Sequence, residues 1–171
     1  MDPTSPGMDR RRRPTREVVI RVGVISDTHG KLRAEALAAL RDCATILHAG
    51  DVGRPEVLDG LRRLTPHVIA VRGNVDGEWA SGLPERTEIE LAGRRVLLLH
   101  DVARLEIEPR AAGLDVVVSG HSHRPRIERR DGVLYLNPGS AGPRRFRLPV
   151  ALARLDMSST RLDATIVELP V

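Results

Sequence analysis

The sequence predicts an α/β fold whose core contains two β-sheets, parallel in the first half of the chain and antiparallel later, with helices outside. Three observations predict it. Hydrophobic strands alternate with amphipathic helical segments up to residue 74, and turn signals between strands replace the helices from residue 86. The 171 residues are 41% hydrophobic, which is enough for one domain with a real core. We therefore expect a disordered basic tail over residues 1–16 and one domain over residues 17–171.

The first half of the chain contains two strand–helix–strand units that share their middle strand. Apolar residues at helical spacing separate the hydrophobic strands, and Pro55 stands where a first helical residue is expected. The predicted strands are 17–26, 44–51 and 67–74, and the predicted helices are 34–43 and 55–65. Consecutive units of this kind indicate a parallel sheet with helices packed on its face.

The second half of the chain consists mainly of strands joined by turns. Residues 86–100 contain two strands around a Gly-containing turn, and residues 116–119 are a buried strand. Asp131-Gly132 is a hairpin signal within residues 126–140. The last two strands lie within residues 150–169, on either side of a polar turn.

The basic character of the chain is concentrated in its first residues. Residues 1–16 hold five arginines against two aspartates, so they carry +3 of the formal +4, and residues 17–171 are nearly neutral. Aromatic residues make up only 2%, so stacking platforms for single-stranded nucleic acid are missing and nucleic acid is not a required partner. Apolar runs are far shorter than the roughly 20 residues that cross a bilayer, and no signal peptide is recognisable. With Cys43 as the single cysteine, we expect a cytoplasmic protein with no membrane partner.

Polar side chains able to bind a metal follow each of five predicted strands. They are Asp27, His29, Asp51, Asn74, His100, His121 and His123. Carboxyl ends of strands in open α/β sheets are where ligands bind, so these residues are expected to converge. His121 and His123 are expected to point to one side, because alternate residues of an extended strand share a face. Asp and Asn are also common in turns, so any one of these residues could simply be a turn former. Turn propensity poorly explains why a metal-competent residue follows each of five strands.

Seven ligands are too many for one tetrahedral ion and suit two metal ions that share a carboxylate. A mixture of imidazole, carboxylate and amide oxygen disfavours an all-oxygen calcium or magnesium site and a thiolate zinc site. The expected cofactors are two divalent transition-metal ions, with manganese favoured and nickel, cobalt, iron or zinc as alternatives.

The ordered motifs SDTHG, HAGDV, VRGNVD, LLLH, SGHSHRP and YLNPGS resemble those of the calcineurin-like metallophosphoesterase superfamily, in particular its small YfcE-type phosphodiesterases. The resemblance runs from about residue 20 to residue 168. It implies a four-layer α/β/β/α sandwich of two mixed β-sheets flanked by helices. It also implies that Asp27, His29, Asp51 and His123 hold a first metal and that Asp51, Asn74, His100 and His121 hold a second, with Asp51 bridging.

The activity expected from this arrangement is hydrolysis of small phosphoesters, most of all phosphodiesters, by a metal-bridging hydroxide. Asn74 is expected to bind the phosphoryl oxygens of the substrate as well as a metal. Two departures from the family pattern matter. Where many relatives have a His after the Asn, this chain has Val75 and Asp76, so Asp76 is a candidate leaving-group acid or an organiser of His121. The loop between His100 and Asp115 is short, which predicts a more open pocket.

Two other function classes stay open. One is a catalytically weak scaffold of the same fold, like the eukaryotic retromer subunit, acting in protein or RNA complexes, and the other is an RNA-associated factor acting through the arginine tail. The presence of all seven predicted metal ligands favours the enzyme over the scaffold. The sequence leaves open whether the chain forms a homo-oligomer. Several residues are interpreted as structural or solvated rather than functional: His48, His67, Trp79, Cys43, Arg144, Arg145 and Arg147.

Overall fold

The computed structural model describes residues 17–171, so the basic tail predicted over residues 1–16 lies outside the described part. A first sheet of five strands has the order β10-β9-β1-β2-β3. Its strands are β1 (Ile20–Ile25), β2 (Thr45–His48), β3 (Val68–Ala70), β9 (Ala151–Met157) and β10 (Leu162–Glu168). The strands β1, β2 and β3 run parallel, whereas β9 pairs antiparallel with both β1 and β10. The sheet is therefore mixed, with its parallel part in the first half of the chain, as the sequence predicts.

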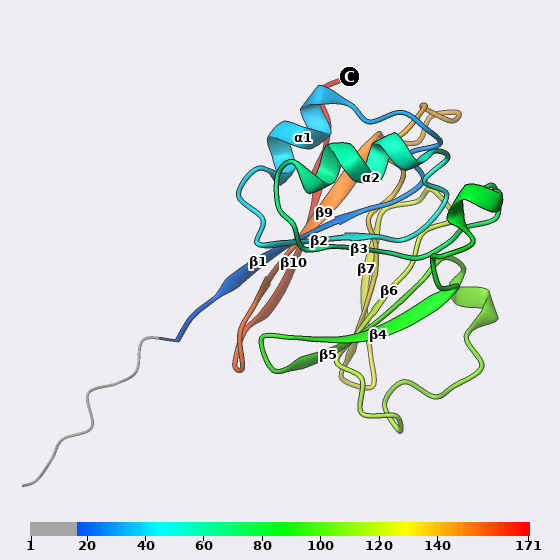
Figure 1. Cartoon of the computed structure of the whole chain (residues 1–171). Coiled ribbons are helices and arrows are strands. Elements are labelled where there is room, and N and C mark those ends of the chain that lie inside the picture. The colour runs from blue at the N-terminus through cyan, green and yellow to red at the C-terminus, as the bar shows by residue number, and fades with distance from the viewer. Residues whose placement is uncertain (1–16) are drawn as a thin grey trace, which may run out of the picture.

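A second sheet of five strands has the order β4-β5-β6-β8-β7 (Figure 1). Its strands are β4 (Arg86–Leu91), β5 (Arg94–Leu99), β6 (Val116–Val118), β7 (Arg126–Arg130) and β8 (Val133–Asn137). The hairpin signal at Asp131-Gly132 is confirmed, because both residues have positive φ angles, 50° and 80°, and join antiparallel β7 and β8. Left-handed conformation at both central residues is what a two-residue hairpin turn requires.

The two sheets pack face to face, and helices cover the outer face of the first sheet (Figure 1). Successive residues of a strand point to opposite faces of the sheet, so one set packs between the two sheets and the other packs against the helices. Val22 and Val24 of β1 point into the core between the sheets with Leu98 of β5, whereas Ile25 points toward the helices with Leu58. The covering helices are α1 (Ala34–Leu40) and α2 (Pro55–Arg62), and α2 begins with proline as predicted. The outer face of this sheet is thereby sealed by two short amphipathic helices.

The outer face of the second sheet is covered by the segment that connects β5 to β6. This segment contains the 3₁₀ helix η2 (Val102–Arg104), and its Leu105 and Leu114 pack on Leu97 and Val117. The expectation that strands of the second half pair antiparallel is wrong for β6, which runs parallel to both β5 and β8. The crossover that parallel β5 and β6 require spans residues 100–115 and contains a 3₁₀ helix in place of an α-helix. The predicted α/β/β/α class is confirmed, with this segment as the fourth layer. A second 3₁₀ helix, η1 (Glu78–Ala80), follows β3.

The carboxyl ends of β1, β2, β3, β5 and β6 lie at the same edge of the molecule, at the right in Figure 1. The loops that follow these strands contain all seven predicted ligands. Within residues 17–171, no helix is long and apolar enough to span a membrane.

Candidate metal centre

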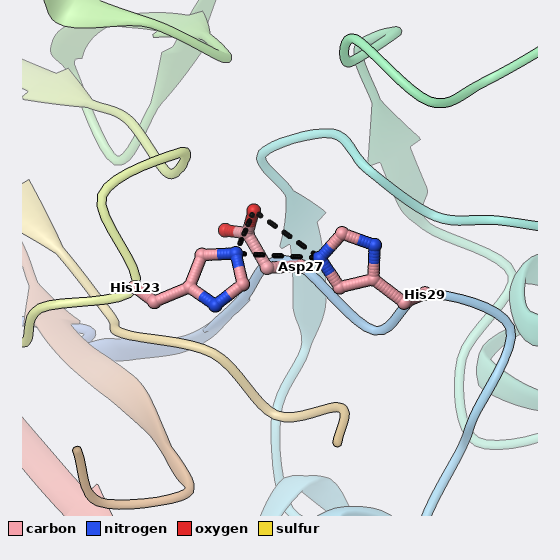
Figure 2. A group of neighbouring side chains, drawn as sticks. All are labelled: Asp27, His29 and His123. Atoms are coloured by element: carbon pink, nitrogen blue, oxygen red, sulfur yellow. Dashed lines mark hydrogen bonds and ion pairs between the residues drawn. The ribbon is translucent and has the colours of Figure 1, made fainter. Parts of the chain in front are cut away.

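A first group of metal-competent side chains consists of Asp27, His29 and His123, which point toward one another (Figure 2). Asp27 directly follows β1 and is fully buried, and its Oδ1 lies 3.2 Å from Nε2 of His123 and 3.9 Å from Nε2 of His29. The two Nε2 atoms are 3.3 Å apart. These three side chains come from two sheets, so the group forms only when the sheets pack together.

A second group consists of Asp27, Asp51 and His100. Oδ2 of Asp51 lies 3.4 Å from Nε2 of His100 and 4.0 Å from Nε2 of His29. Asp51 therefore stands between a histidine of the first group and the histidine of the second, while Asp27 is common to both groups.

Buried polar atoms without hydrogen bonds occur at the same place, apart from Nδ1 of His123, which lies on the side of its ring away from Asp27 (Figure 2). Among the described residues they are Oδ1 of Asp27, Nε2 of His100 and Nδ1 of His123. Buried polar atoms are rarely left without a partner, so such atoms need an explanation. Nδ1 of His100 lies 2.7 Å from the carbonyl of Ala49 and can only donate to it, which leaves a lone pair on Nε2. The free oxygen of Asp27 and the free nitrogen of His100 thus fit a divalent transition metal, whose preferred ligands are imidazole and carboxylate.

The remaining oxygen of each carboxylate is fixed by the protein. Oδ2 of Asp27 accepts hydrogen bonds from the Ser26 hydroxyl at 2.6 Å and from the His121 N–H at 3.1 Å. Oδ1 of Asp51 accepts from the N–H of Val75 at 3.0 Å. One oxygen of each aspartate is thereby oriented, and the other faces the histidines.

Asn74 and His121 lie beside these groups rather than within them. Asn74 is exposed and lines, together with His100, a cavity of about 640 Å³. The side chain of His121 is 47% exposed, its Nε2 lies 4.0 Å from Oδ2 of Asp101, and its ring packs edge-on against His100 with centroids 5.2 Å apart. The structure therefore brings five of the seven predicted residues together and places the other two on the open side near His100.

The expectation that His121 and His123 share one face of an extended strand is wrong. Strand β6 ends at Val118, and the two histidines lie in the following loop with φ angles of 67° and 58°. In this left-handed conformation the rings diverge, so that His123 reaches Asp27 and His121 reaches His100.

Left-handed backbone is concentrated in the predicted ligands. Among the described residues, the non-glycine residues with positive φ include Asp27, His29, Asp51, His121 and His123. This conformation is uncommon for side-chain-bearing residues, although Asp and His tolerate it better than most. Strained residues cluster at functional sites because the surrounding structure has to hold them there. The backbone strain therefore marks the loops of the predicted site independently of the side-chain chemistry.

Supporting residues connect the ligand loops to one another. The carboxylate of Asp76 accepts backbone N–H groups of Val52 at 3.2 Å, Gly53 at 2.8 Å and Gly73 at 2.8 Å. These contacts join the loop that holds Asp51 to the loop that holds Asn74. The described contacts include no bond between Asp76 and His121, so the interpretation of Asp76 as an organiser of His121 is wrong.

A second supporting residue, Asn137, had no role in the sequence analysis although its motif was recognised. Its side-chain amide donates to the carbonyl of Gly120 at 2.6 Å and to the Ser122 hydroxyl at 3.1 Å, and its Oδ1 accepts from the N–H of Gly139. Asn137 thereby braces the loop of His121 and His123. Its position at the end of a strand, before Pro-Gly, was the available signal.

Burial and the aspartates act in opposite directions on the ionisation of the site. Burial alone raises the pKa of Asp51, but the neighbouring His100 and the Val75 N–H outweigh it and lower that pKa to about 2. Burial also lowers the pKa of His29. For His100 the Asp51 carboxylate and the Ala49 carbonyl outweigh burial and raise the pKa above its ordinary value. Asp51 is thus held as an anion beside His29 and His100, and this negative charge favours a cation at the site.

The residues interpreted as structural behave accordingly. His48 is fully buried and hydrogen-bonded, His67 is exposed, and Cys43 packs in the core between the first sheet and the helices. Trp79 is 36% exposed in η1. Arg144 is exposed and donates to the carbonyl of Val171.

Two packed mixed sheets with a cluster of aspartates and histidines at their shared edge define a metal-dependent hydrolase of the α/β class. The chain belongs to the calcineurin-like phosphoesterase superfamily, because the model of that superfamily's domain matches residues 20–160. The enzyme class predicted from the sequence, a metal-dependent phosphoesterase, is confirmed by this membership.

Relatives of known name and structure agree with the family assignment. A probable metallophosphoesterase of Methanothermobacter thermautotrophicus is 37% identical over 85% of this chain and 91% of its own length. The structure of an archaeal phosphodiesterase is similar with a TM-score of 0.73 at 25% identity, over 86% of this chain and all of that one. Vps29 of Chaetomium thermophilum shares the fold, with a TM-score of 0.71 at 18% identity over 88% of this chain and 97% of its own.

Proposed function

We propose that the chain is a binuclear metal-dependent phosphoesterase that acts chiefly on small phosphodiesters. The observation that carries this proposal is the presence of two adjacent groups of metal-competent side chains, Asp27 with His29 and His123 and Asp27 with Asp51 and His100, in which Oδ1 of Asp27 and Nε2 of His100 are buried without a hydrogen bond. The proposed first site comprises Asp27, His29, Asp51 and His123, and the proposed second site comprises Asp51, Asn74, His100 and His121. The names of the archaeal relatives, metallophosphoesterase and phosphodiesterase, support the same activity.

Asp51 is the proposed bridge between the two sites. Its Oδ2 lies within 4.0 Å of His29, assigned to the first site, and 3.4 Å from His100, assigned to the second. Among the described residues, Asp27 forms ion pairs with His29 and His123, both assigned to the first site, and a ligand atom of Asp27 lies within 4.8 Å of one of His100 without forming an ion pair. Asp51 is thus the carboxylate with a histidine of each site beside it.

Two divalent ions in these positions would lower the pKa of a bound water toward 7 and so supply hydroxide at neutral pH. The protein contributes the arrangement around that chemistry. Asn74 and His121 lie on the open side, where an amide or imidazole N–H can donate to phosphoryl oxygens as negative charge develops there. The cavity of about 640 Å³ beside Asn74 is within the range typical of small-molecule sites, which supports a small substrate.

Asp76 is better suited to positioning than to proton donation. Its two carboxylate oxygens together accept three backbone N–H groups, and the side chain is nearly buried. We therefore assign no leaving-group acid to this chain, and we expect substrates with good leaving groups to react faster.

The test of this function is metal content measured together with hydrolysis. After saturating reconstitution with Mn²⁺, the purified chain should hold about two ions and hydrolyse bis(p-nitrophenyl) phosphate, and a chelator should remove both properties. His67→Ala, which removes a surface histidine, is the control for nonspecific metal binding. A content of one ion or none would contradict the binuclear site. Reconstitution with nickel, cobalt, iron and zinc would rank the metals against manganese.

A scaffold of the same fold is the second candidate, and the similarity to Vps29 favours it. That similarity, at 18% identity, concerns the fold alone. All seven positions predicted to bind metal carry a side chain able to do so, whereas a scaffold has no need to keep them. A chain that binds metal but hydrolyses no phosphoester would support the scaffold. A cytoplasmic location and a homo-oligomeric state both stay predictions.

A further inference from the structure

The loop over residues 141–149, between β8 and β9, borders the metal centre. At its start, the Ser140 hydroxyl donates to the carbonyl of Asp27 at 2.9 Å, and the N–H of Ala141 donates to the carbonyl of Ser26 at 3.0 Å. The loop is therefore attached directly to the segment that contains Asp27. The group esterified to a phosphate at the candidate metal centre would therefore lie next to this loop.

Phe146 is the most exposed large hydrophobic side chain of the described residues. It is the single phenylalanine of the chain, and 94% of it is accessible to solvent. Its backbone has a φ angle of 53°, which is unfavourable for a residue with a side chain. Phe146 lies within a turn that is closed by a hydrogen bond from the N–H of Leu148 to the carbonyl of Arg145 at 3.1 Å. Neither packing nor backbone preference accounts for an aromatic ring in this place.

Three arginines surround this ring in the sequence, and all are exposed: Arg144, Arg145 and Arg147. The guanidinium of Arg144 donates to the carbonyl of Val171 at 2.8 Å, whereas no hydrogen bond or ion pair of the Arg145 or Arg147 side chain is found among the described residues. An aromatic residue with arginines before and after it in the sequence is a combination suited to nucleotides, since bases stack on an aromatic ring and phosphate oxygens accept from a guanidinium.

We propose that Phe146 and its flanking arginines bind the nucleoside part of a nucleotide phosphoester whose phosphate lies at the metal centre. A single aromatic face stacks a single base, so the ligand is a short nucleotide rather than a long strand. An aromatic residue among arginines also suits an anionic membrane surface. Because the loop is attached beside Asp27, we favour a small ligand that contacts Phe146 and the candidate metal centre simultaneously over a membrane surface. This inference rests on the proposed phosphoesterase function and names the substrate class of that site.

Two substrates with one leaving group test it: thymidine 5′-(p-nitrophenyl phosphate) and methyl p-nitrophenyl phosphate. The measured quantity is the ratio of their kcat/KM values for the full chain reconstituted with Mn²⁺. In Phe146→Leu, which keeps apolar bulk but removes the ring, the ratio should fall on the order of tenfold. In Phe146→Trp, which keeps an aromatic face, the preference for the thymidine ester should persist. Ile127→Ala, at another exposed apolar position, is the control. An unchanged ratio in Phe146→Leu would overturn the proposal.

Equilibrium binding of thymidine 5′-monophosphate separates this inference from the phosphoesterase function. If the wild-type chain hydrolyses neither ester, the proposed function fails, and the affinity for the monophosphate decides the nucleoside site on its own. An affinity about tenfold weaker in Phe146→Leu than in wild type then supports the site, and equal affinities overturn it. Retention on phosphatidylserine vesicles that depends on Phe146, with no effect on the monophosphate, would also overturn it and assign the loop to a membrane surface.

Discussion

At the scale of single residues, His48 shows how a histidine near a metal centre is excluded from it. The Thr28 hydroxyl donates to the carbonyl of Val52 at 2.9 Å, so it has no hydrogen left and must accept from Nε2–H of His48, also at 2.9 Å. Nδ1 of His48 accepts from the N–H of Gly50 at 3.2 Å. Both ring nitrogens are thus used in the neutral form, and burial lowers the pKa of His48 to about 4.

This histidine should make stability depend on pH. Between about pH 4 and the ordinary value of 6.5, the unfolded chain binds a proton at His48 that the native chain does not. The free energy of unfolding should therefore fall as pH drops through this window, by up to about 3 kcal/mol from this residue. Urea denaturation at pH 7.0 and 4.5, with chelator present to exclude metal release, measures the change. His48→Gln should show a clearly smaller decrease, and an identical decrease in both proteins would contradict the assignment.

Asp76 allows a positioning role to be distinguished from proton donation. Asp76→Asn replaces a carboxylate oxygen by an amide that cannot accept, so at least one of the three backbone N–H groups loses its partner. We expect the free energy of unfolding to fall by about 1–3 kcal/mol. Turnover should fall by the same factor for p-nitrophenyl and phenyl diesters. A loss confined to the phenyl ester, the poorer leaving group, would instead identify Asp76 as the acid.

At the scale of elements, close contact between loops positions the ligands. A Cβ atom at Gly120 would lie 2.0 Å from Oγ of Ser26 and 2.7 Å from Oδ2 of Asp27. Gly120→Ala should therefore displace Asp27 and weaken metal binding on the order of 10–100-fold, as loss of groups that orient ligands does. Gly82→Ala is the matched control, because nothing lies within 4 Å of its added Cβ. Metal titration of both variants checks this, and equal affinities would contradict it.

The strands and the convergence of five predicted ligands were predictable from the sequence because both depend on local patterns. Buried β1 and β2 are hydrophobic runs followed by Asp27 and Asp51, and strand ends of a parallel sheet meet at one edge. The orientations of His121 and His123 were not predictable in this way. They depend on left-handed backbone held by the partner loops, including the contact of the His121 N–H with Asp27. The contacts of Asp76 were hidden for the same reason, since they join segments distant in sequence.

At the scale of the whole molecule, the metal centre connects the two sheets. Asp27, His29 and Asp51 follow strands of the first sheet, whereas His100 and His123 follow strands of the second. Ions bound among them would link the sheets at one edge, in addition to the apolar core between them. Metal binding should consequently stabilise the folded chain as a unit.

Thermal unfolding tests this linkage. A ligand at 100 times its Kd stabilises the state that binds it by about 2.7 kcal/mol, so saturating Mn²⁺ should raise the Tm by several degrees over the chelated protein. His123→Ala should reduce the increase, because it removes a ligand that the second sheet contributes. A Tm that does not respond to Mn²⁺ in the wild-type chain would contradict the linkage.

The bridging role of Asp51 is the central claim, and the metal content of Asp51→Asn tests it most directly. The substitution removes the negative charge next to His29 and His100, so the metal content should fall from about two ions to nearly none and hydrolysis should be lost. His123→Ala should retain about one ion, and Asp59→Asn, on exposed α2, should retain two. An Asp51→Asn chain with two tightly bound ions and near-normal turnover would contradict the bridge and the phosphoesterase mechanism built on it.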